Sequence, residues 1–192
     1  LAESDSGREP TRQPDEDEGQ PAEGKPLEQP QPATPGDHRS ADSADAIQVA
    51  ANPDDITVLV NKQFKLPENY NPDDLVEPNV PFIFEEKLEK RKMRREAAKA
   101  LEEMFAAAKD DGIYLAGVSG YRSEQTQRAL YENYAARDGE EAANRYSAKP
   151  GHSEHQTGLA MDVSGSDGKC AAEDCFADTQ EAKWLAEHAH EY

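Results

Sequence analysis

The sequence predicts an α+β fold in which helices pack on a small, mainly antiparallel sheet, preceded by a disordered acidic and proline-rich segment. Long stretches with helical periodicity alternate with a few short apolar runs, too few for a series of β-α-β units. Residues 1–53 hold eight of the thirteen prolines and almost no large apolar side chains. Because such a stretch cannot bury enough apolar surface to offset its ordering entropy, we expect a tether over 1–53 and a folded domain over 54–192.

The first part of the folded domain is expected to contain one strand and one long helix. The β-branched run Ile56–Val60 is consistent with a strand, and a loop rich in Pro, Asn and Asp follows it. The pattern then predicts a helix from Glu85 to about Asp110, ended near Gly112. Basic residues near the start of this helix form either a solvated face or a contact for anionic polymers. The apolar stripe of the helix consists of Leu88, Leu101, Met104, Phe105 and Ala108.

The second part of the domain is expected to alternate short strands with helices. Ser123 is a suitable N-cap for the helix that follows it. The last helix is expected to pack Trp184 and to leave the histidines at its C-terminal end. The expected elements are a strand at Ile113–Val118, helices at Glu124–Arg137 and near Gly139–Ala143, a strand at Leu159–Val163, and a helix at about Thr179–Glu191.

Charge and composition narrow the class of protein. The formal net charge is -19 and the pI is about 4.6, which argues against nucleic-acid binding because that function needs a basic surface. No run of about eighteen apolar residues exists that could span a membrane. The chain starts at Leu1, so either a signal segment was removed or the start is arbitrary. Cys170 and Cys175 form either a local disulfide or two free thiols, and an exported protein favours the disulfide.

A histidine and an aspartate seven positions apart are the first sign of a chemical site. They lie in the run Gly151–Asp162, where His155 offers an imidazole nitrogen and Asp162 a carboxylate oxygen to a borderline-soft metal such as zinc. Gly158 between them permits a tight turn, so that a following strand can carry Asp162 into the site. The alternatives are an exposed histidine, a turn-forming aspartate, or a simple hydrogen bond between the two side chains.

A second segment supplies a candidate anion site. Arg122 stands at a predicted junction from strand to helix, where the helix N-terminus already favours anions. Its planar guanidinium suits bidentate capture of a carboxylate, and Gln127 lies about one turn into the helix. An anion-binding arginine near a metal-binding His/Asp pair is typical of an enzyme that holds a peptide by its C-terminal carboxylate. Taken alone, Arg122 is more typical of a surface salt-bridge residue.

Together the two segments resemble the VanY-type D-alanyl-D-alanine carboxypeptidase family, which includes the L,D-carboxypeptidases of bacterial cell walls. The resemblance runs from about Thr57 to the end of the chain. The matching stretches are Leu59–Lys62, Leu66–Pro67, Ser119–Ser123 with Gln127, Leu130–Tyr134, Ser147–Gly158 with Asp162, and Trp184–Ala186.

The resemblance implies a role for each matching residue. His155 and Asp162 match two of three zinc ligands, and Arg122 and Gln127 match residues that hold the terminal D-alanine. Ser153 matches a further polar contact beside the metal. The family's third ligand, a histidine, and its general-base glutamate have no match here, because the sequence stops at Tyr192. We therefore expect the glutamate beyond Tyr192 and interpret the chain as lacking its last strands. A complete protein of degenerate activity is the alternative.

The function implied is a zinc-dependent carboxypeptidase that removes the terminal D-alanine from peptidoglycan stem peptides. A non-catalytic stem-peptide binding module of the same fold is the first alternative, and a generic zinc peptidase is the second. The implied location is the extracellular face of the cell envelope. The acidic tether would space the domain from the membrane, or act only as a solubilising tail. A monomer is the default expectation, with no nucleic-acid partner.

Overall fold

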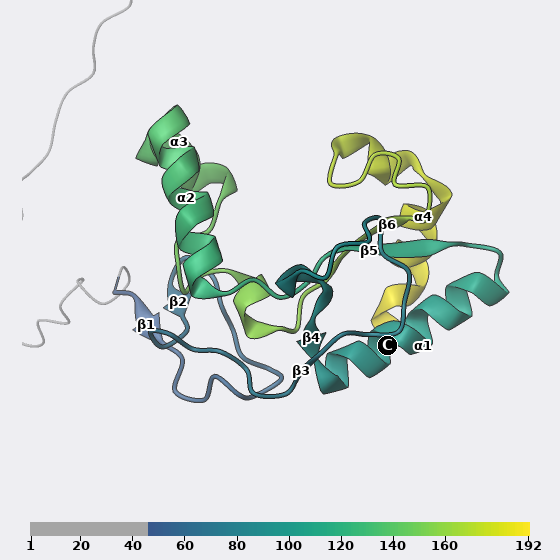
Figure 1. The fold of residues 1–192 in the computed structure, drawn as a ribbon, viewed down its shortest axis with the longest axis horizontal. Coiled ribbons are helices and arrows are strands. Elements are labelled where there is room, and N and C mark those ends of the chain that lie inside the picture. Colours follow the sequence, from purple (N-terminus) through teal and green to yellow (C-terminus); the bar gives the residue numbers. More distant parts are fainter. Residues whose placement is uncertain (1–45) are drawn as a thin grey trace, which may run out of the picture. The chain divides into compact units, whose positions relative to one another are not determined.

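The computed structural model describes residues 46–192, and its strands form three separate pairs (Figure 1). Strand β1 (Gln48–Val49) pairs in parallel with β2 (Phe64–Lys65). Strands β3 (Leu75–Val76) and β4 (Met93–Arg94) are antiparallel, as are β5 (Leu115–Ser119) and β6 (Asp162–Gly165). The mixture of helices and short, mainly antiparallel strands confirms the predicted α+β class. The expectation of one sheet is wrong for the described residues, because each pair stands alone.

Helices make up most of the regular structure. The α-helices are α1 (Arg95–Asp110), α2 (Glu124–Asp138), α3 (Glu140–Tyr146) and α4 (Gln180–His188). Short 3-10 turns connect them at η2 (Glu89–Arg91), η3 (Glu154–Thr157), η4 (Asp174–Asp178) and η5 (Ala189–Glu191). The predictions for α2, α3 and α4 are therefore confirmed to within a few residues.

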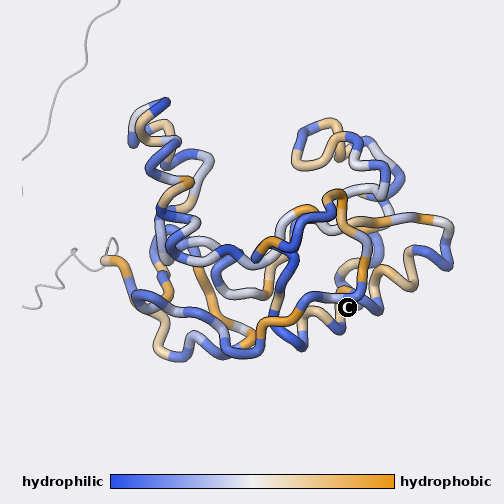
Figure 2. Tube along the Cα trace, in the orientation of Figure 1, coloured by the Kyte–Doolittle hydropathy of each residue, from blue (hydrophilic) through white to orange (hydrophobic). Residues whose placement is uncertain are grey.

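The main core lies where α1 packs against β5 and α4. Figure 2 shows hydrophobic and hydrophilic residues alternating along α1, as expected for a helix with one buried face. Its buried residues Leu101, Met104 and Phe105 join Leu115 and Trp184 in one apolar cluster. The Trp184 indole Nε1 donates to Asp111 Oδ2 at 2.8 Å, so the buried ring keeps a partner for its polar atom. This cluster supports β5, which leads directly into the candidate site.

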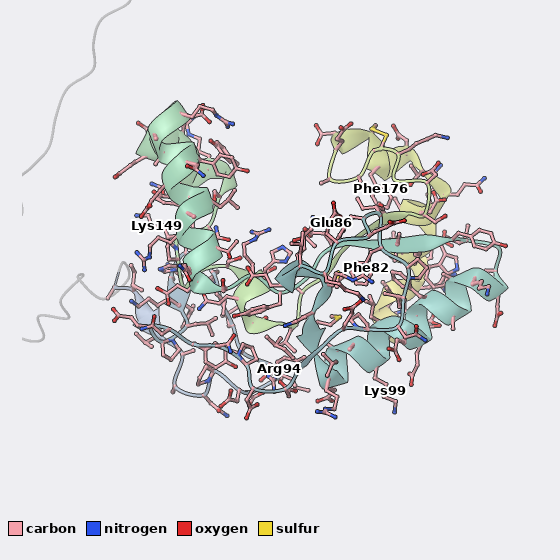
Figure 3. The ribbon with its side chains drawn as sticks, in the orientation of Figure 1. Phe82, Glu86, Arg94, Lys99, Lys149 and Phe176 are labelled. Carbon is pink, nitrogen blue, oxygen red and sulfur yellow. A yellow bond between two sulfur atoms is a disulfide. The ribbon has the colours of Figure 1, made fainter. Side chains whose placement is uncertain are left out.

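The long helix predicted from Glu85 begins ten residues later, at Arg95. Tertiary hydrogen bonds take the backbone of the preceding residues out of a helix: the Lys90 and Lys92 carbonyls accept from the Gly120 and Tyr121 amides, each at 2.7 Å. The predicted basic helix face is also wrong, because Lys90 lies over the Phe84 ring at 3.9 Å. Lys90 and Arg91 therefore contact aromatic rings of the fold and do not form a solvated helix face. Figure 3 labels Phe82 and, lower in the view, Arg94.

The strand predicted at Ile56–Val60 is absent, and a turn occupies these positions. Asp55 Oδ1 accepts from the Thr57 amide at 2.8 Å and from the Thr57 hydroxyl at 2.7 Å. Such local side-chain bonds compete with strand pairing. Ile56 and Leu59 are exposed, and only Val60 is buried, so the apolar run does not form the face of a sheet.

The predicted tether lies mostly outside the described residues. Residues 1–45 are not described, so disorder over that stretch stays a prediction. Of the remaining predicted tether, Gln48–Val49 form β1. No helix within residues 46–192 has the length and apolar character needed to cross a bilayer.

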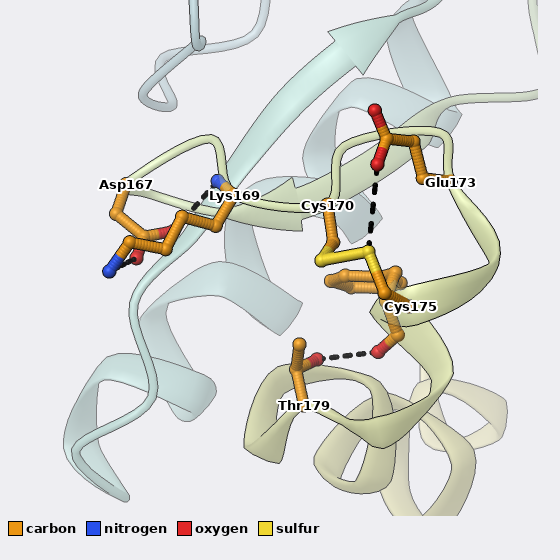
Figure 4. Close-up of a disulfide and its surroundings, with 7 residues drawn as sticks. Asp167, Lys169, Cys170, Glu173, Cys175 and Thr179 are labelled. Carbon is orange, nitrogen blue, oxygen red and sulfur yellow. Dashed lines mark hydrogen bonds and ion pairs between the residues drawn. A yellow bond between two sulfur atoms is a disulfide. The ribbon is translucent and has the colours of Figure 1, made fainter. Parts of the chain in front are cut away.

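The predicted disulfide between Cys170 and Cys175 is confirmed, with a sulfur–sulfur distance of 2.07 Å (Figure 4). It closes a loop between β6 and α4. Glu173 in this loop points towards the bridge, with Oε2 at 3.6 Å from Cys175 Sγ. Thr179 follows the loop and caps α4 by accepting from the Ala182 amide at 3.1 Å.

Candidate functional site

The pairing of β5 with β6 brings the two sequence motifs together. In the register of this pair, Ser119 stands opposite Asp162, with an irregularity between Gly117 and Ser119. Ser119 ends β5 and Asp162 begins β6, so the Gly120–Arg122 segment emerges beside the aspartate. The Arg122 amide donates to the His155 carbonyl at 3.1 Å, which joins the second motif to the first. Residues more than thirty positions apart therefore meet in one place.

His155 and Asp162 face each other, and the imidazole is held in one orientation. His155 Nε2 lies 3.5 Å from Asp162 Oδ2. On the other side of the ring, Nδ1 lies 2.8 Å from the Gly120 carbonyl oxygen. A carbonyl only accepts, so Nδ1 carries the proton and Nε2 presents its lone pair towards the aspartate. Metal-ligating histidines are commonly oriented by this kind of bond to a backbone carbonyl.

The pair fits a shared metal ion. Two ligand atoms of a tetrahedral zinc, each about 2.0–2.1 Å from the metal, lie about 3.3 Å apart. The observed separation of 3.5 Å between Nε2 and Oδ2 is close to that value. An imidazole nitrogen and a carboxylate oxygen are also a donor set that zinc accepts. His155 and Asp162 could therefore supply two ligands without rearrangement.

Within residues 46–192, the structure groups no third histidine, cysteine or carboxylate with this pair. The single cluster of three such groups in that range is Cys170, Glu173 and Cys175, and its cysteines are joined in the disulfide. The C-terminal histidines do not complete the site. His188 stacks on Trp184, with ring centroids 4.9 Å apart, and His190 is exposed, as expected for a helix end.

The turn at Gly158 differs from the predicted strand. Gly158 has a φ of 71°, which confirms the tight turn. The chain then runs irregularly, and β6 begins at Asp162, so the predicted strand Leu159–Val163 starts three residues late. The reason is that the Gly158 carbonyl accepts from the Arg94 amide at 2.7 Å, a bond to β4. Asp162 therefore stands at the first position of its strand, half exposed and beside His155.

Among residues 46–192, Arg122 has no carboxylate partner. Its Nη1 donates to Gln127 Oε1 at 2.9 Å, and its Nη2 lies 3.4 Å from Ser119 Oγ. In the described part of the chain, none of the ion pairs includes this guanidinium. The interpretation of Arg122 as a surface salt-bridge residue is therefore wrong for that range. A partly buried cation without a counter-charge is a suitable place for an anionic group of a ligand.

Gln127 and the start of α2 fix the orientation of Arg122. The Gln127 side chain is buried, and its Nε2 donates to the Ala148 carbonyl at 2.7 Å, so its oxygen is directed at the arginine. Ser123 is the N-cap that was predicted, with Oγ accepting from the Thr126 amide at 3.3 Å. The Ser123 amide donates in turn to Glu89 Oε1 at 3.2 Å. These bonds attach α2 to the η2 turn.

The site opens into a pocket of about 730 Å³, here called the site pocket. Four of the predicted site residues line it: Arg122, Gln127, Ser153 and His155. Ser153 is buried, which agrees with a position in the wall. Asp162 is not part of the lining but lies next to His155, with Oδ2 at 3.5 Å from Nε2. The structure thus brings all five predicted residues to one location.

Two buried polar residues were not singled out from the sequence. Gln156 is fully buried, and it bridges the Gly151 amide and the Tyr70 carbonyl, at 3.1 and 3.2 Å. Tyr121 is also buried, and its hydroxyl donates to Asn71 Oδ1 at 2.5 Å. Burial raises the pKa of the Tyr121 hydroxyl, and the Glu89 carboxylate adds to the shift. In the sequence Gln156 stands between His155 and Thr157 and forms no chemical pattern of its own, so only its place in the family motif could have marked it.

Comparison with known proteins assigns the family. A family profile described as D-alanyl-D-alanine carboxypeptidase (VanY) matches residues 90–192, more than half of the chain. The chain belongs to the VanY family. The prediction made from the Arg122 and His155 motifs is thereby confirmed at the level of the family.

Relatives and solved structures agree with this membership. The Bacillus subtilis protein YodJ, named as a carboxypeptidase, is 48% identical over 148 residues, which cover 77% of this chain and 54% of YodJ. The chain spans about half the length of the curated relatives it matches. The solved structure of LdcB, an LD-carboxypeptidase described in terms of peptidoglycan recognition, is also similar. Its TM-score is 0.73 at 48% identity, and the match covers 76% of this chain and 68% of LdcB. DacB from Streptococcus pneumoniae D39 has a TM-score of 0.50 at 37% identity, covering 70% and 60%.

Proposed function

We propose that this VanY-family chain belongs to a zinc-dependent carboxypeptidase that removes the terminal D-alanine from peptidoglycan stem peptides. One observation carries the proposal. Arg122, a partly buried cation without an ion pair in the described residues, lines the same pocket as His155, whose Nε2 faces Asp162 at 3.5 Å. A carboxylate-binding group beside a metal-binding pair is what cleavage at a free C-terminus requires.

Arg122 and Gln127 hold the end of the substrate. The guanidinium forms a bidentate pair with the terminal carboxylate, which selects peptides with a free C-terminus. The Gln127 oxygen, 2.9 Å from Arg122 Nη1, keeps the fork in position before the substrate arrives. Ser153 offers a hydroxyl from the buried wall of the pocket. Such positioning brings the last peptide bond next to His155 and Asp162.

His155 Nε2 and Asp162 Oδ2 would hold the metal. A bound zinc would polarise the scissile carbonyl and lower the pKa of its water towards about 7. His155 Nδ1 donates to the Gly120 carbonyl, so Nε2 is the ring nitrogen left to bind a metal. The glutamate general base and the third ligand predicted beyond Tyr192 remain predictions.

The likeness to LdcB favours a tetrapeptide, in which an L,D bond is cut. LdcB is an LD-carboxypeptidase, and it is 48% identical to this chain. The family description names D-alanyl-D-alanine, which corresponds to the D,D bond of a pentapeptide. We further propose action at the extracellular face of the cell envelope, with residues 1–53 as an acidic tether, residues 54–192 as the carboxypeptidase domain, and a monomeric state.

A binding module without catalysis is the second candidate. It is favoured by the absence, within residues 46–192, of a third potential ligand grouped with His155 and Asp162. Such a module would still hold the terminal carboxylate at Arg122. The carboxypeptidase and the binding module would therefore recognise the same terminal carboxylate, but only the carboxypeptidase would cleave the peptide.

The test is mass spectrometry of pentapeptide and tetrapeptide muropeptides incubated with zinc and a protein that carries this chain together with the predicted third ligand and general base. The proposal predicts loss of one alanine, blocked by a chelator, and the mass identifies the bond. Intact muropeptides that nevertheless bind with zinc present would support the binding module.

Two variants with matched controls assign the residues. Arg122→Ala is expected to weaken binding of free C-termini by about 100-fold, since a charge-assisted bidentate pair is lost. Arg128→Ala on the exposed side of α2 should have no such effect. His155→Ala should lower zinc content, measured by elemental analysis, whereas His190→Ala should not. Unchanged zinc in His155→Ala would remove His155 from the ligand set.

A further inference from the structure

The site pocket is rich in positive charge, although the chain as a whole is strongly acidic. The sequence has 40 acidic and 21 basic residues. The pocket lining nevertheless includes three cations besides Arg122, namely Lys62, Arg145 and Lys149, against one carboxylate, Glu154. A concave surface of one charge sign concentrates ligands of the opposite sign. This reversal of charge is therefore local to the pocket.

The two lysines are available to a ligand. Neither Lys62 nor Lys149 belongs to an ion pair among residues 46–192, and both are exposed. Arg145 is already paired with Glu141 at 2.8 Å, one turn away on α3. Among residues 46–192, Lys62 and Lys149 are thus, together with Arg122, the pocket cations without an ion pair.

Hydrogen bonds of neighbouring residues connect the chain segments that carry the two lysines to the candidate site. Lys149 directly follows Ala148, whose carbonyl accepts from Gln127 Nε2 at 2.7 Å. Lys62 lies in a turn made by Asn61, whose Oδ1 accepts from the Phe64 amide at 2.9 Å. The Asn61 carbonyl lies 2.7 Å from His152 Nδ1, which connects this turn to the His155 loop. The backbone positions of the two lysines are therefore set together with the site.

The pocket also exceeds what a terminal residue needs. Its volume of about 730 Å³ is large enough for a ligand of drug size, for which pockets measure about 300–1,000 Å³. Apolar side chains that are otherwise exposed, Ile47 at 56% and Tyr146 at 53%, are part of its lining. An aliphatic segment of a ligand can cover them. The lining thus combines an apolar surface with two ammonium groups that have no ion pair among the described residues.

We propose that the site pocket recognises a second carboxylate in the substrate, upstream of the C-terminal one, and that Lys149 and Lys62 determine this specificity. The inference rests on the proposed function and deepens it by naming the substrate class. That class is a peptide with a free C-terminus and a further free carboxylate, joined by an aliphatic segment. An amidated form of the same peptide lacks the second charge and is bound more weakly.

The experiment uses four peptides of one stem sequence that end in D-alanine. The C-terminus is either carboxylate or carboxamide, and the upstream acid is likewise either free or amidated. Binding to the full chain, with zinc present, is measured by isothermal titration calorimetry. The free upstream acid is expected to bind about fivefold more tightly than its amide, the size expected for a charge pair in a partly open site. Raising the salt concentration should reduce this ratio.

Variants separate this inference from the proposed function. Lys62→Gln with Lys149→Gln should bring the upstream ratio close to one and leave the C-terminal ratio unchanged. Lys99→Gln, an exposed lysine on α1 well away from Lys149 in Figure 3, is the matched control and should change neither ratio. An upstream ratio of one in the unmodified chain, or a ratio that the double variant retains, overturns the inference. A C-terminal ratio of one overturns the proposed function instead.

Discussion

At the residue scale, the candidate site depends on side chains that each use two polar atoms for two different contacts. His155 uses Nδ1 to bond the Gly120 carbonyl at 2.8 Å and leaves Nε2 towards Asp162. Gln127 donates from Nε2 to the Ala148 carbonyl and accepts with Oε1 from Arg122. In both cases one polar atom fixes the orientation and the other faces a second residue of the site. This arrangement keeps the geometry in place without a ligand.

Gly158 is the residue at which a small change is expected to be costly. Its φ is 71°, and a Cβ there would lie 2.9 Å from Leu75 Cδ2 and 3.0 Å from Arg94 Cγ. Gly158→Ala should therefore lower the free energy of unfolding by about 2–3 kcal/mol, from backbone strain together with a clash. Urea denaturation measures this loss.

The matched control for Gly158 is Gly112→Ala. Gly112 has a φ of 80°, but a Cβ added there would meet no atom within 4 Å, so this position carries the strain without the clash. We expect its loss to be about 1 kcal/mol. Equal losses for the two variants would mean that the contact with Leu75 and Arg94 is unimportant.

At the element scale, α2 links stability to the candidate anion site. Its N-cap Ser123 accepts from the Thr126 amide, and the Ser123 hydroxyl also lies 3.3 Å from Glu89 Oε1. Arg122 is the residue directly before this cap, so the position of its backbone depends on that of Ser123. The start of α2 therefore anchors the guanidinium, while the far end of the helix packs against α3.

Ser123→Ala is expected to lower the free energy of unfolding by about 1 kcal/mol through loss of the cap. It should also weaken binding of peptides with a free C-terminus, because Arg122 loses a fixed neighbour. Thr179→Ala removes the N-cap of α4, which accepts from Ala182 at 3.1 Å, and is the control. The two variants should lose similar stability in urea denaturation. A carboxylate preference, measured by calorimetry, that falls equally in both would argue against a local role for α2.

At the scale of the whole molecule, a loop-closing disulfide supplements a modest core. The Cys170–Cys175 bridge lies in the connection from β6 to α4, next to the helix that contributes Trp184 to the apolar cluster. The bridge therefore constrains the segment between the Asp162 strand and the last helix. It acts on the unfolded chain as well, since it removes conformations there.

Reduction of this bridge is expected to lower the free energy of unfolding by about 2 kcal/mol on the chain-entropy account of a short loop. Thiol titration of the denatured, unreduced protein should find no free thiols, and a dithiol reductant should lower the Tm. A double variant, Cys170→Ser with Cys175→Ser, should have a Tm that no longer responds to the reductant. Two free thiols before reduction would contradict the bridge.

The sequence by itself determined the local features of this protein. The N-cap at Ser123, the turn at Gly158 and the apolar face of α1 depend on residues a few positions apart, whose propensities act within one turn of chain. The paired motifs around Arg122 and His155 also identified the family, because they resemble the motifs of its members.

Only the tertiary structure decided which segments those features would meet. The Lys90 and Lys92 carbonyls bond to Gly120 and Tyr121, so α1 begins at Arg95 although the local pattern continues a helix back to Glu85. Gln156 owes its role to the Tyr70 carbonyl, 86 positions away. Backbone groups must find partners when they are buried, and which partner is nearest depends on the packing of the whole chain. Pairing of Ser119 with Asp162 in β5 and β6 is likewise a long-range choice, and it is what assembles the site.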